Sequence, residues 1–230
     1  MATQLDLQEQ EQVDALKAFW KQYGNLITWA LVAALLVYAG INGWQWYQRD
    51  QSQKAGAMYD ELDRAVAAGD ADKSARIFAD LKDRYAGTAY AQQGGLQTAK
   101  VQADKGKAED ARATLTWVAG HALEEEYRVI ARLRLSALLI DAKQTDDALK
   151  QLEGLDAGPF AALAADRRGD ALMAQGKKDA AVAAYQQAWK AMDARLDYRR
   201  LVDAKLTALG AAPSAAEGPA SAASAGGATR

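Results

Sequence analysis

The longest apolar stretch of the chain covers residues 22–48 and contains no charged side chain. Its centre is rich in Leu, Val and Ala, and aromatic residues such as Trp20, Tyr23 and Trp44 stand on both sides of that centre. At about 1.5 Å of rise per residue, a helix over this stretch spans the hydrocarbon core of a bilayer, and Trp and Tyr favour the two interfaces. The pattern predicts one transmembrane helix over residues 22–48, preceded by a short segment over residues 1–21.

A cleaved signal peptide and a buried soluble helix both fit the apolar stretch less well than a membrane anchor does. A signal peptide begins with a short basic segment, whereas acidic residues precede the stretch here, namely Asp6, Glu9, Glu11 and Asp14. A buried helix of a soluble domain needs neighbours on all sides, and the remaining chain is too small to surround a helix of this length. Lys and Arg are nearly balanced on the two sides of the stretch, so the charges do not settle its orientation.

From residue 49 to residue 210, apolar and small residues recur at helical spacing, and no segment alternates with the period of two that a strand requires. Residues 169–188 place small, turn-forming and large side chains where a tetratricopeptide repeat needs them. Gly169 and Ala181 allow two antiparallel helices to approach closely, and Gly176 closes the turn between them. Tyr185 and Ala188 then pack the second helix onto the first.

Weaker copies of this pattern stand upstream, with small and large residues at Ser136, Leu139, Ala148 and Leu152 and again at Ala99, Gly106, Ala111 and Leu115. A degenerate first pair covers residues 55–85 and turns at Gly69 and Asp70, and residues 198–209 suggest a capping helix. The sequence therefore predicts an all-α protein: a single transmembrane helix, a tetratricopeptide-repeat-like α-solenoid over residues 49–210, and a disordered Ala/Ser/Gly/Pro tail over residues 211–230.

Composition narrows the classes of function. The 230-residue chain has a formal net charge of −2 with acidic and basic residues interspersed, so it offers no basic stripe for nucleic acid. It has no cysteine, which excludes disulfides, thiol catalysis and zinc–thiolate sites. His121 precedes three glutamates at residues 124–126, but a lone histidine makes a weak metal site, and the glutamates fit the first turn of a helix. We predict a non-enzymatic protein without a catalytic site, metal or cofactor.

Three motifs carry a resemblance to a known family. Residues 18–25 read Ala-Phe-Trp-Lys-Gln-Tyr-Gly-Asn before the anchor, residues 43–47 read Gly-Trp-Gln-Trp-Tyr at its end, and residues 85–91 read Tyr-Ala-Gly-Thr-Ala-Tyr-Ala. Together with the Ala-rich repeats, they make the chain resemble the YfgM-like ancillary subunits of the SecYEG translocon, up to about residue 209. The family commonly has a proline at the position of Ala86, which is a minor departure.

The resemblance implies a bacterial inner-membrane protein with a cytoplasmic N-terminus and a periplasmic repeat domain. The partners that it implies are the SecYEG translocon, a periplasmic chaperone such as a membrane-anchored prolyl-isomerase-like protein, exported polypeptides and membrane lipid. The implied function is a scaffold that links the translocon to chaperones during protein export. Two alternatives stay open: a cytoplasm-facing repeat adaptor that regulates a signalling pathway, and a protein that self-assembles in the membrane.

The first helix of each repeat in such proteins exposes side chains on the concave side. Carried over to this sequence, these positions give a candidate peptide-binding groove of Leu96, Lys100, Asp104, Leu133, Ile140, Asp141, Asp166, Asp170 and Met173. Ala103 and Ala137 stand at such positions as well. Apolar positions in the groove would give affinity for an extended polypeptide, and the charges would set its register. The plainer interpretation of each residue alone is core packing or solvation. A clamp of Lys and Asn for a terminal carboxylate is not expected, because Leu133 and Asp166 stand at such positions.

The predicted anchor has small residues at helical spacing. Ala30 and Ala34 form one small-xxx-small pair, Ala39 and Gly43 form another, and Asn42 is the polar residue beside them. These residues are candidate contacts with another transmembrane helix. The competing interpretation is that Ala is common throughout this chain and that Asn42 lies at the membrane interface.

Overall fold

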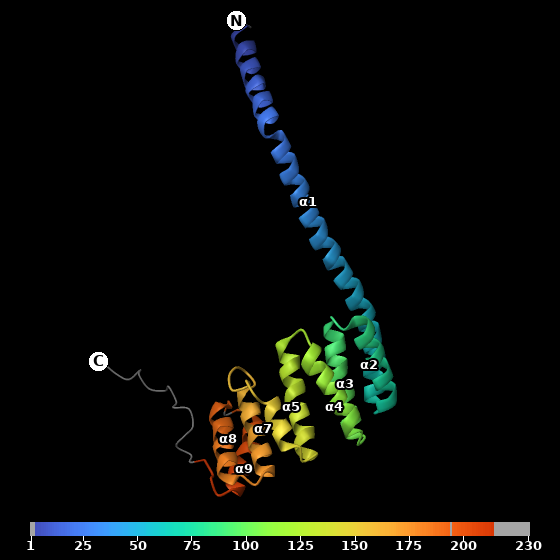
Figure 1. The fold of residues 1–230 in the computed structure, drawn as a ribbon, viewed down its shortest axis with the longest axis vertical. Coiled ribbons are helices and arrows are strands. Elements are labelled where there is room, and N and C mark those ends of the chain that lie inside the picture. Colours follow the sequence, from blue (N-terminus) through green and yellow to red (C-terminus); the bar gives the residue numbers. More distant parts are fainter. Residues whose placement is uncertain (1–2, 194, 214–230) are drawn as a thin grey trace, which may run out of the picture. The chain divides into compact units, whose positions relative to one another are not determined.

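The computed structural model describes residues 3–193 and 195–213, with side chains from residue 11 onward. Within these residues it contains nine α-helices and no strand, which confirms the predicted all-α class (Figure 1). The predicted disordered tail lies outside the described residues from position 214 on. The helices are α1 (Thr3–Ala67), α2 (Ala71–Tyr85), α3 (Ala89–Asp104), α4 (Ala108–His121), α5 (Glu125–Asp141), α6 (Thr145–Gln151), α7 (Ala161–Ala174), α8 (Lys178–Ala191) and α9 (Asp197–Ala208).

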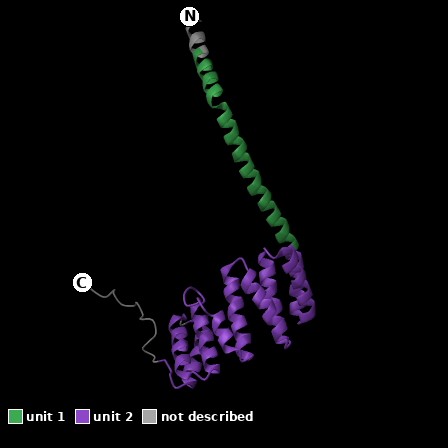
Figure 2. Ribbon diagram, in the orientation of Figure 1, with its two compact units in different colours: residues 1–54 green, residues 55–230 purple. Residues whose placement is uncertain are grey.

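The chain divides into two compact units, residues 1–54 and residues 55–230 (Figure 2). Helix α1 runs without interruption from the first unit into the second, so the segment before the anchor, the anchor and the first repeat helix form one helix of 65 residues. The sequence has no proline before residue 159, and its glycines within α1 are tolerated in a helix. No turn signal therefore interrupts the helix before Gly69.

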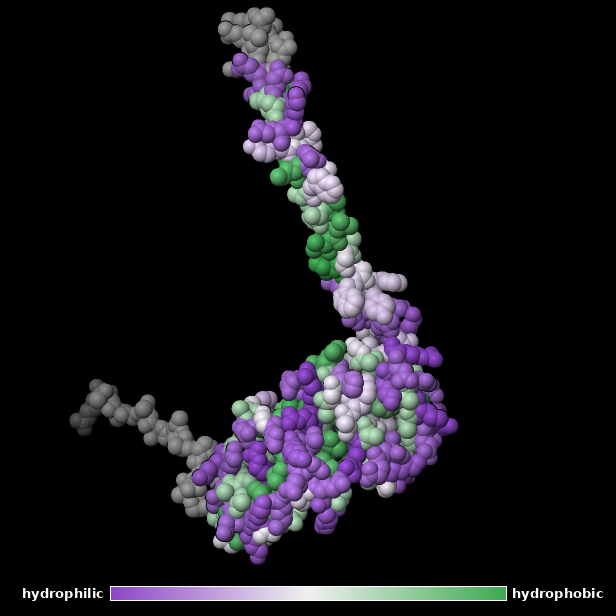
Figure 3. Space-filling model, viewed as in Figure 1, coloured by the Kyte–Doolittle hydropathy of each residue, from purple (hydrophilic) through white to green (hydrophobic). Residues whose placement is uncertain are grey.

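Within the first unit, residues 22–48 of α1 are mostly apolar on the outside of the helix. Large side chains such as Leu26, Trp29, Leu36 and Ile41 are exposed. Figure 3 shows a hydrophobic stretch, coloured green, part of the way along this helix. In the part of the chain that the structure describes, α1 is the one helix long and apolar enough to cross a membrane. Exposed apolar side chains are costly in water and favourable in lipid, so this stretch fits a single-pass membrane protein.

The second unit consists of consecutive helix pairs, in which α2 packs on α3, α3 on α4, α5 on α6 and α7 on α8. The small and large residues predicted for each repeat are buried: Ala99, Ala111, Leu115, Ser136, Leu139, Ala148, Leu152, Gly169, Ala181, Tyr185 and Ala188. The hydroxyl of Ser136 also donates a hydrogen bond of 3.1 Å to the carbonyl oxygen of Ala148. Small residues thus stand where paired helices approach, as the repeat pattern predicts.

The turns inside the pairs share one backbone geometry. Gly69, Gly106 and Gly176 have positive φ of 65°, 75° and 76°, and Lys143 takes the same place in its pair with φ 62°. At Gly176 the chain makes two reversed hydrogen bonds, from its own N–H to Met173 (2.9 Å) and from the next N–H to Leu172 (3.0 Å). This pattern satisfies carbonyl groups that a helix end leaves free, so each first helix stops at a fixed residue.

Helix α9 ends the solenoid as the predicted cap. Its residues Val202 and Leu206 are fully buried, in one cluster with Tyr185 and Met192. The guanidinium of Arg199 lies 3.9 Å from the ring centroid of Trp189 and adds a cation–π contact between α8 and α9. The last apolar face of the repeats is therefore covered by the chain itself.

Candidate protein-binding groove

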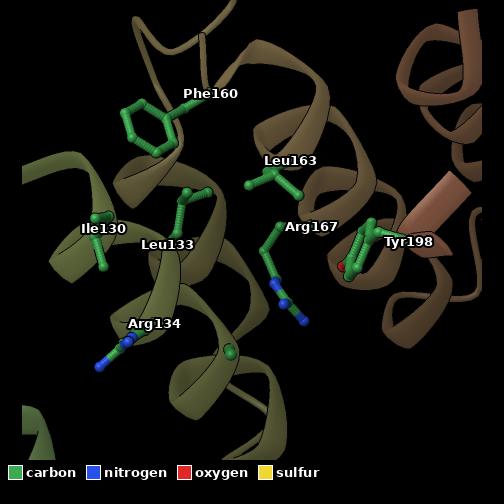
Figure 4. Close-up of a pocket in the computed structure, with 8 residues that line it drawn as sticks. Ile130, Leu133, Arg134, Phe160, Leu163, Arg167 and Tyr198 are labelled. Carbon is green, nitrogen blue, oxygen red and sulfur yellow. The ribbon is translucent and has the colours of Figure 1, made fainter. Parts of the chain in front are cut away.

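Two adjoining pockets open on the first helices of the repeat pairs. The first has a volume of about 280 Å³ and is lined by Ile130, Leu133, Arg134, Ala137, Phe160, Leu163, Arg167 and Tyr198 (Figure 4). The second has a volume of about 310 Å³ and is lined by Ala99, Lys100, Ala103, Asp104, Leu115, Arg134, Ala137 and Leu138. Arg134 and Ala137 line both pockets, so these residues together are called the groove from here on. Three of its positions are alanines, Ala99, Ala103 and Ala137, whose small side chains leave space in the groove.

Apolar and cationic side chains occupy different parts of the first pocket. Leu133 comes from α5, Leu163 from the first turn of α7 and Phe160 from the residue just before α7, and the three side chains gather at one end (Figure 4). Leu133 and Phe160 are held there by a buried cluster behind them. The guanidinium groups of Arg134 and Arg167 lie at the other end. The pocket can therefore take an apolar group next to an anionic one.

The two arginines differ in their partners. Arg167 donates from Nη1 to Oδ2 of Asp170 at 3.1 Å, one turn along α7. Arg134 donates from Nη1 to the backbone carbonyl oxygen of Leu96 at 3.0 Å, which ties α5 to α3. Although Arg134 is exposed, the apolar surface around it desolvates its guanidinium and lowers the pKa of that group. Arginine stays charged nonetheless, because its ordinary pKa is far above neutrality.

A polar network beneath the groove joins α7, α8 and α9. The carboxylate of Asp166 is fully buried and accepts hydrogen bonds from Lys205 (2.8 Å) and from the hydroxyl of Tyr198 (2.7 Å). Lys205 also pairs with Asp170 at 2.7 Å, and Asp170 accepts a hydrogen bond from Tyr185 at 2.8 Å. Burial, together with these hydrogen bonds, raises the pKa of both tyrosines above its ordinary value. The network fixes Tyr198, and with it one side of the groove.

Three of the predicted groove residues line the groove in the structure: Lys100, Asp104 and Leu133. Lys100 and Asp104 lie one turn apart on α3 and pair at 2.7 Å. Two positions that accompanied them in the repeat pattern, Ala103 and Ala137, line the groove as well. The structure thus brings these side chains together on one surface, and their role in binding stays a prediction.

The other predicted groove residues lie elsewhere. Leu96 is buried in the core between α3, α4 and α5, while Ile140 and Met173 are half-buried against the cores. Asp141 is exposed at the end of α5. Asp166 and Asp170 are engaged in the network with Lys205, so neither carboxylate is free to meet a ligand. Apart from Asp141, these side chains pack or pair within the repeat domain.

Several residues of the groove were not expected from the sequence, among them Arg134, Phe160, Arg167 and Tyr198. Arg134 had a usable signal, because it lies three residues before Ala137 and so shares its face of α5. Phe160 and Tyr198 had none, since one lies in a loop and the other on the capping helix. Their place beside α5 depends on how α7 and α9 pack.

The candidate transmembrane contacts Ala30, Ala34, Ala39, Asn42 and Gly43 are all exposed on α1. The side-chain amide of Asn42 donates a hydrogen bond of 2.8 Å to the carbonyl oxygen of Tyr38, one turn back. This bond satisfies part of the amide within the helix. A Cβ atom added at Gly43 would meet nothing within 4 Å, so the small surface is open to a neighbouring helix. The predicted contact with another helix remains a prediction.

His121 is engaged locally at the end of α4. Its Nδ1 lies 3.0 Å from the carbonyl oxygen of Trp117, and the two rings stack with centroids 5.1 Å apart. Glu125 and Glu126 form the first turn of α5, as the sequence predicts. Among the described residues there is no group of three or more His, Asp or Glu side chains that could hold a metal ion.

Fold and groove together define a membrane-anchored repeat protein of the tetratricopeptide class. The chain matches the family model described as "Tetratricopeptide repeat-like domain" over residues 17–211, which include most of α1 and every repeat helix. Solved structures of MamA also align with the chain, including the form "MamA 41-end from Desulfovibrio magneticus RS-1". That structure is 19% identical with a TM-score of 0.49, and the alignment covers 68% of this chain and 93% of that one.

Curated relatives identify the particular family. The chain is 29% identical to the ancillary SecYEG translocon subunit of Escherichia coli (strain K12), over 77% of this chain and 85% of the relative. It is 32% identical to that of Haemophilus influenzae, over 79% and 89%, and 28% identical to that of Neisseria gonorrhoeae, over 88% and 98%. The chain belongs to the family of ancillary SecYEG translocon subunits, which confirms the resemblance in its motifs.

Proposed function

We propose that this protein is a non-enzymatic ancillary subunit of the SecYEG translocon that holds periplasmic chaperones beside the channel. The observation that supports this most directly is the extent of the family match, which covers the apolar part of α1 as well as the repeat helices. The name that the relatives share supports the translocon as the partner. The open groove supports a role in binding protein segments.

In this proposal each part of the chain has its own place. Residues 22–48 cross the inner membrane, residues 1–21 are cytoplasmic, and residues 49–210 form the periplasmic repeat domain. The partners of the repeat domain are a membrane-anchored prolyl-isomerase-like chaperone and exported polypeptides. The small pairs of α1, Ala30 with Ala34 and Ala39 with Gly43, are the surfaces through which it contacts helices of the channel.

The anchor supplies the mechanism of such a scaffold. A protein confined to the bilayer beside the channel meets emerging chains at a far higher effective concentration than a freely diffusing one. Weak contacts in the groove would then be occupied often enough to matter. Weak binding also allows each segment to leave, which a protein in the path of export requires.

The test is to replace residues 22–48 with an unrelated single span of equal length and to purify the tagged protein from membranes in mild detergent. We expect the native protein to bring SecYEG subunits with it and the replaced variant to lose them, while the circular dichroism of the repeat helices is unchanged. A finer variant, Ala30→Leu with Ala34→Leu, fills the first of the two small pairs of α1. Its control, Val32→Phe, adds bulk on the opposite face of the same helix.

Each outcome of this purification bears on a different part of the proposal. Undiminished recovery of SecYEG by the replaced variant would show that the anchor does not carry the association. Recovery of cytoplasmic proteins alone would favour the cytoplasm-facing adaptor. Recovery of nothing but further copies of the chain would favour self-assembly in the membrane.

A further inference from the structure

The groove carries three cations, and they differ in whether a carboxylate stands beside them. Lys100 is paired with Asp104 at 2.7 Å and Arg167 with Asp170 at 3.1 Å. Arg134 has no carboxylate partner among the described residues, and its side-chain hydrogen bond goes to a backbone carbonyl oxygen. A guanidinium has five N–H donors, so one carbonyl oxygen leaves most of the fork unused. Arg134 therefore offers the groove a free positive charge and free donors.

Arg134 also lies where the two pockets meet. Leu115 and Leu138 line the pocket on its α3 side, and Leu133 and Leu163 line the pocket on its α7 side (Figure 4). A charge beside apolar surface is poorly hydrated, so an opposite charge brought to it gains more than it would in open water. The same apolar surface gives binding energy to an apolar group on either side. Along the groove, an apolar pocket is followed by the cationic Arg134 and then by a second apolar pocket.

We propose that the groove binds an extended polypeptide segment in which an acidic side chain pairs with Arg134 and the flanking apolar side chains enter the two pockets. Alternate side chains of an extended chain point the same way, so the segment has the pattern apolar-x-acidic-x-apolar. Because a pocket lies on each side of Arg134, the bound chain continues in both directions. The carboxylate therefore belongs to an internal Glu or Asp and not to a chain terminus.

This inference rests on the proposed function, since it names the chemistry of the protein segment that the scaffold takes. Exported polypeptides and chaperone surfaces both contain such segments. The groove therefore recognises the apolar-x-acidic-x-apolar pattern and not one particular protein. A single charge pair between two small pockets gives weak and selective binding, which suits a scaffold that releases its segments.

The test uses a nine-residue fluorescent peptide with blocked ends, a central glutamate, leucine two residues to either side, and serine or glycine elsewhere. The full-length protein in lipid nanodiscs is titrated against it by fluorescence anisotropy, with empty nanodiscs as the control for partition into lipid. A matched peptide has glutamine at the centre. We expect the glutamine peptide to bind about tenfold more weakly, because it loses a charge-assisted hydrogen bond. Added salt should weaken only the glutamate peptide.

Three variants locate the effect in the groove. Arg134→Gln should abolish the difference between the two peptides. Arg132→Gln is its matched control, because Arg132 lies on the same helix and donates to the carbonyl oxygen of Glu153 at 2.6 Å, outside the groove. Ala137→Glu places a carboxylate one turn from Arg134 and narrows both pockets, so it should remove binding of either peptide. Circular dichroism checks that each variant remains folded.

The inference is overturned if the two peptides bind the native protein equally, or if neither binds. A third peptide carries its only carboxylate as a free C-terminus. If it binds better than the glutamate peptide, the inference that the groove takes an internal Glu or Asp is wrong. Recovery of SecYEG with Arg134→Gln is measured in parallel. If the peptides fail to discriminate while SecYEG is still recovered, the groove inference fails and the proposed function stands.

Discussion

At the scale of single residues, Gly169 on α7 is the described glycine at which an added Cβ would come closest to a neighbouring side chain, that of Tyr185 on α8. A Cβ atom added at Gly169 would lie 2.5 Å from Cδ1 of Tyr185, inside van der Waals contact. The ring cannot move aside easily, since it is buried and its hydroxyl is bound to Asp170. The glycine is therefore required by packing and not by its backbone angle, which is helical.

We expect Gly169→Ala to lower the free energy of unfolding by about 1–3 kcal/mol, because the added methyl group overpacks the α7–α8 contact. Gly120→Ala on α4 is the matched control, since its added Cβ would meet nothing within 4 Å. That change should stabilise the protein by about 0.5–1 kcal/mol through helix propensity. Thermal unfolding of the purified protein, followed by circular dichroism, measures both. Shifts of the same sign would contradict the packing argument.

The network of Tyr185, Tyr198, Asp166 and Asp170 makes the free energy of unfolding decrease as the pH rises in the alkaline range. The folded state raises the pKa of Tyr185 and Tyr198 above the ordinary value of about 10, chiefly through burial and then through hydrogen bonds to Asp170 and Asp166. Above pH ~10 the unfolded chain releases these protons more readily, so stability that is complete below that pH is lost as the pH rises. The melting temperature should fall between pH 9 and pH 11.5. In the double variant Tyr185→Phe with Tyr198→Phe the fall should be shallower, and equal slopes would refute this origin.

At the scale of elements, the helix pairs share one turn geometry, with a residue of positive φ between the two helices. Three of the turns use glycine at positive φ, and the α5–α6 turn uses Lys143 instead. A left-handed conformation costs an ordinary residue about 1–2 kcal/mol, while glycine adopts it freely. Lys143 therefore marks a strained position in an otherwise regular series. The turn makes the same reversed backbone hydrogen bonds as the Gly176 turn, from Lys143 N–H to Ile140 (2.9 Å) and from Gln144 N–H to Leu139 (2.8 Å). In the described part of the chain the side chain of Lys143 adds no hydrogen bond or ion pair to them.

We expect Lys143→Gly to raise the free energy of unfolding by about 0.5–1 kcal/mol, part of the relieved strain being offset by the greater freedom of glycine in the unfolded chain. Gly176→Ala, at the same place in its own turn, should have the opposite sign and a similar size. Chemical denaturation of the two variants beside the native protein provides the measurement. A destabilising Lys143→Gly would mean that the lysine has a role that the backbone angle does not reveal.

Most of the helices and turns of the repeat domain could be predicted from the sequence. The repeat signature at Gly169, Gly176 and Ala181 correctly predicted the helix, turn and helix of α7 and α8. The turn at Gly69 and the cap at α9 were predicted as well. What the pattern did not reveal is that α1 is continuous from residue 3 to residue 67, because a change from lipid-facing to core-facing composition need not break a helix.

At the scale of the whole molecule, the orientation of the chain in the membrane is the property with the largest consequence. Basic residues on the two sides of the apolar stretch are balanced, so they leave it undetermined. The proposed function requires a periplasmic repeat domain. Alkaline phosphatase, which is active only in the periplasm, fused after residue 213 should therefore be active. The same enzyme fused to the N-terminus is the control and should be inactive, and the reverse pattern would overturn the proposed placement.

The sequence by itself determined the class of the protein, because periodicity, small residues and an uncharged apolar stretch are local properties that neighbouring residues along one helix express. It also pointed to Lys100, Asp104 and Leu133 on the groove. Only the tertiary structure decided that Asp166 is buried against Lys205, that Leu96 is core, and that Arg134 stands unpaired between two pockets. Those facts depend on which helices meet across the solenoid, and packing between distant segments leaves no periodic trace in the sequence.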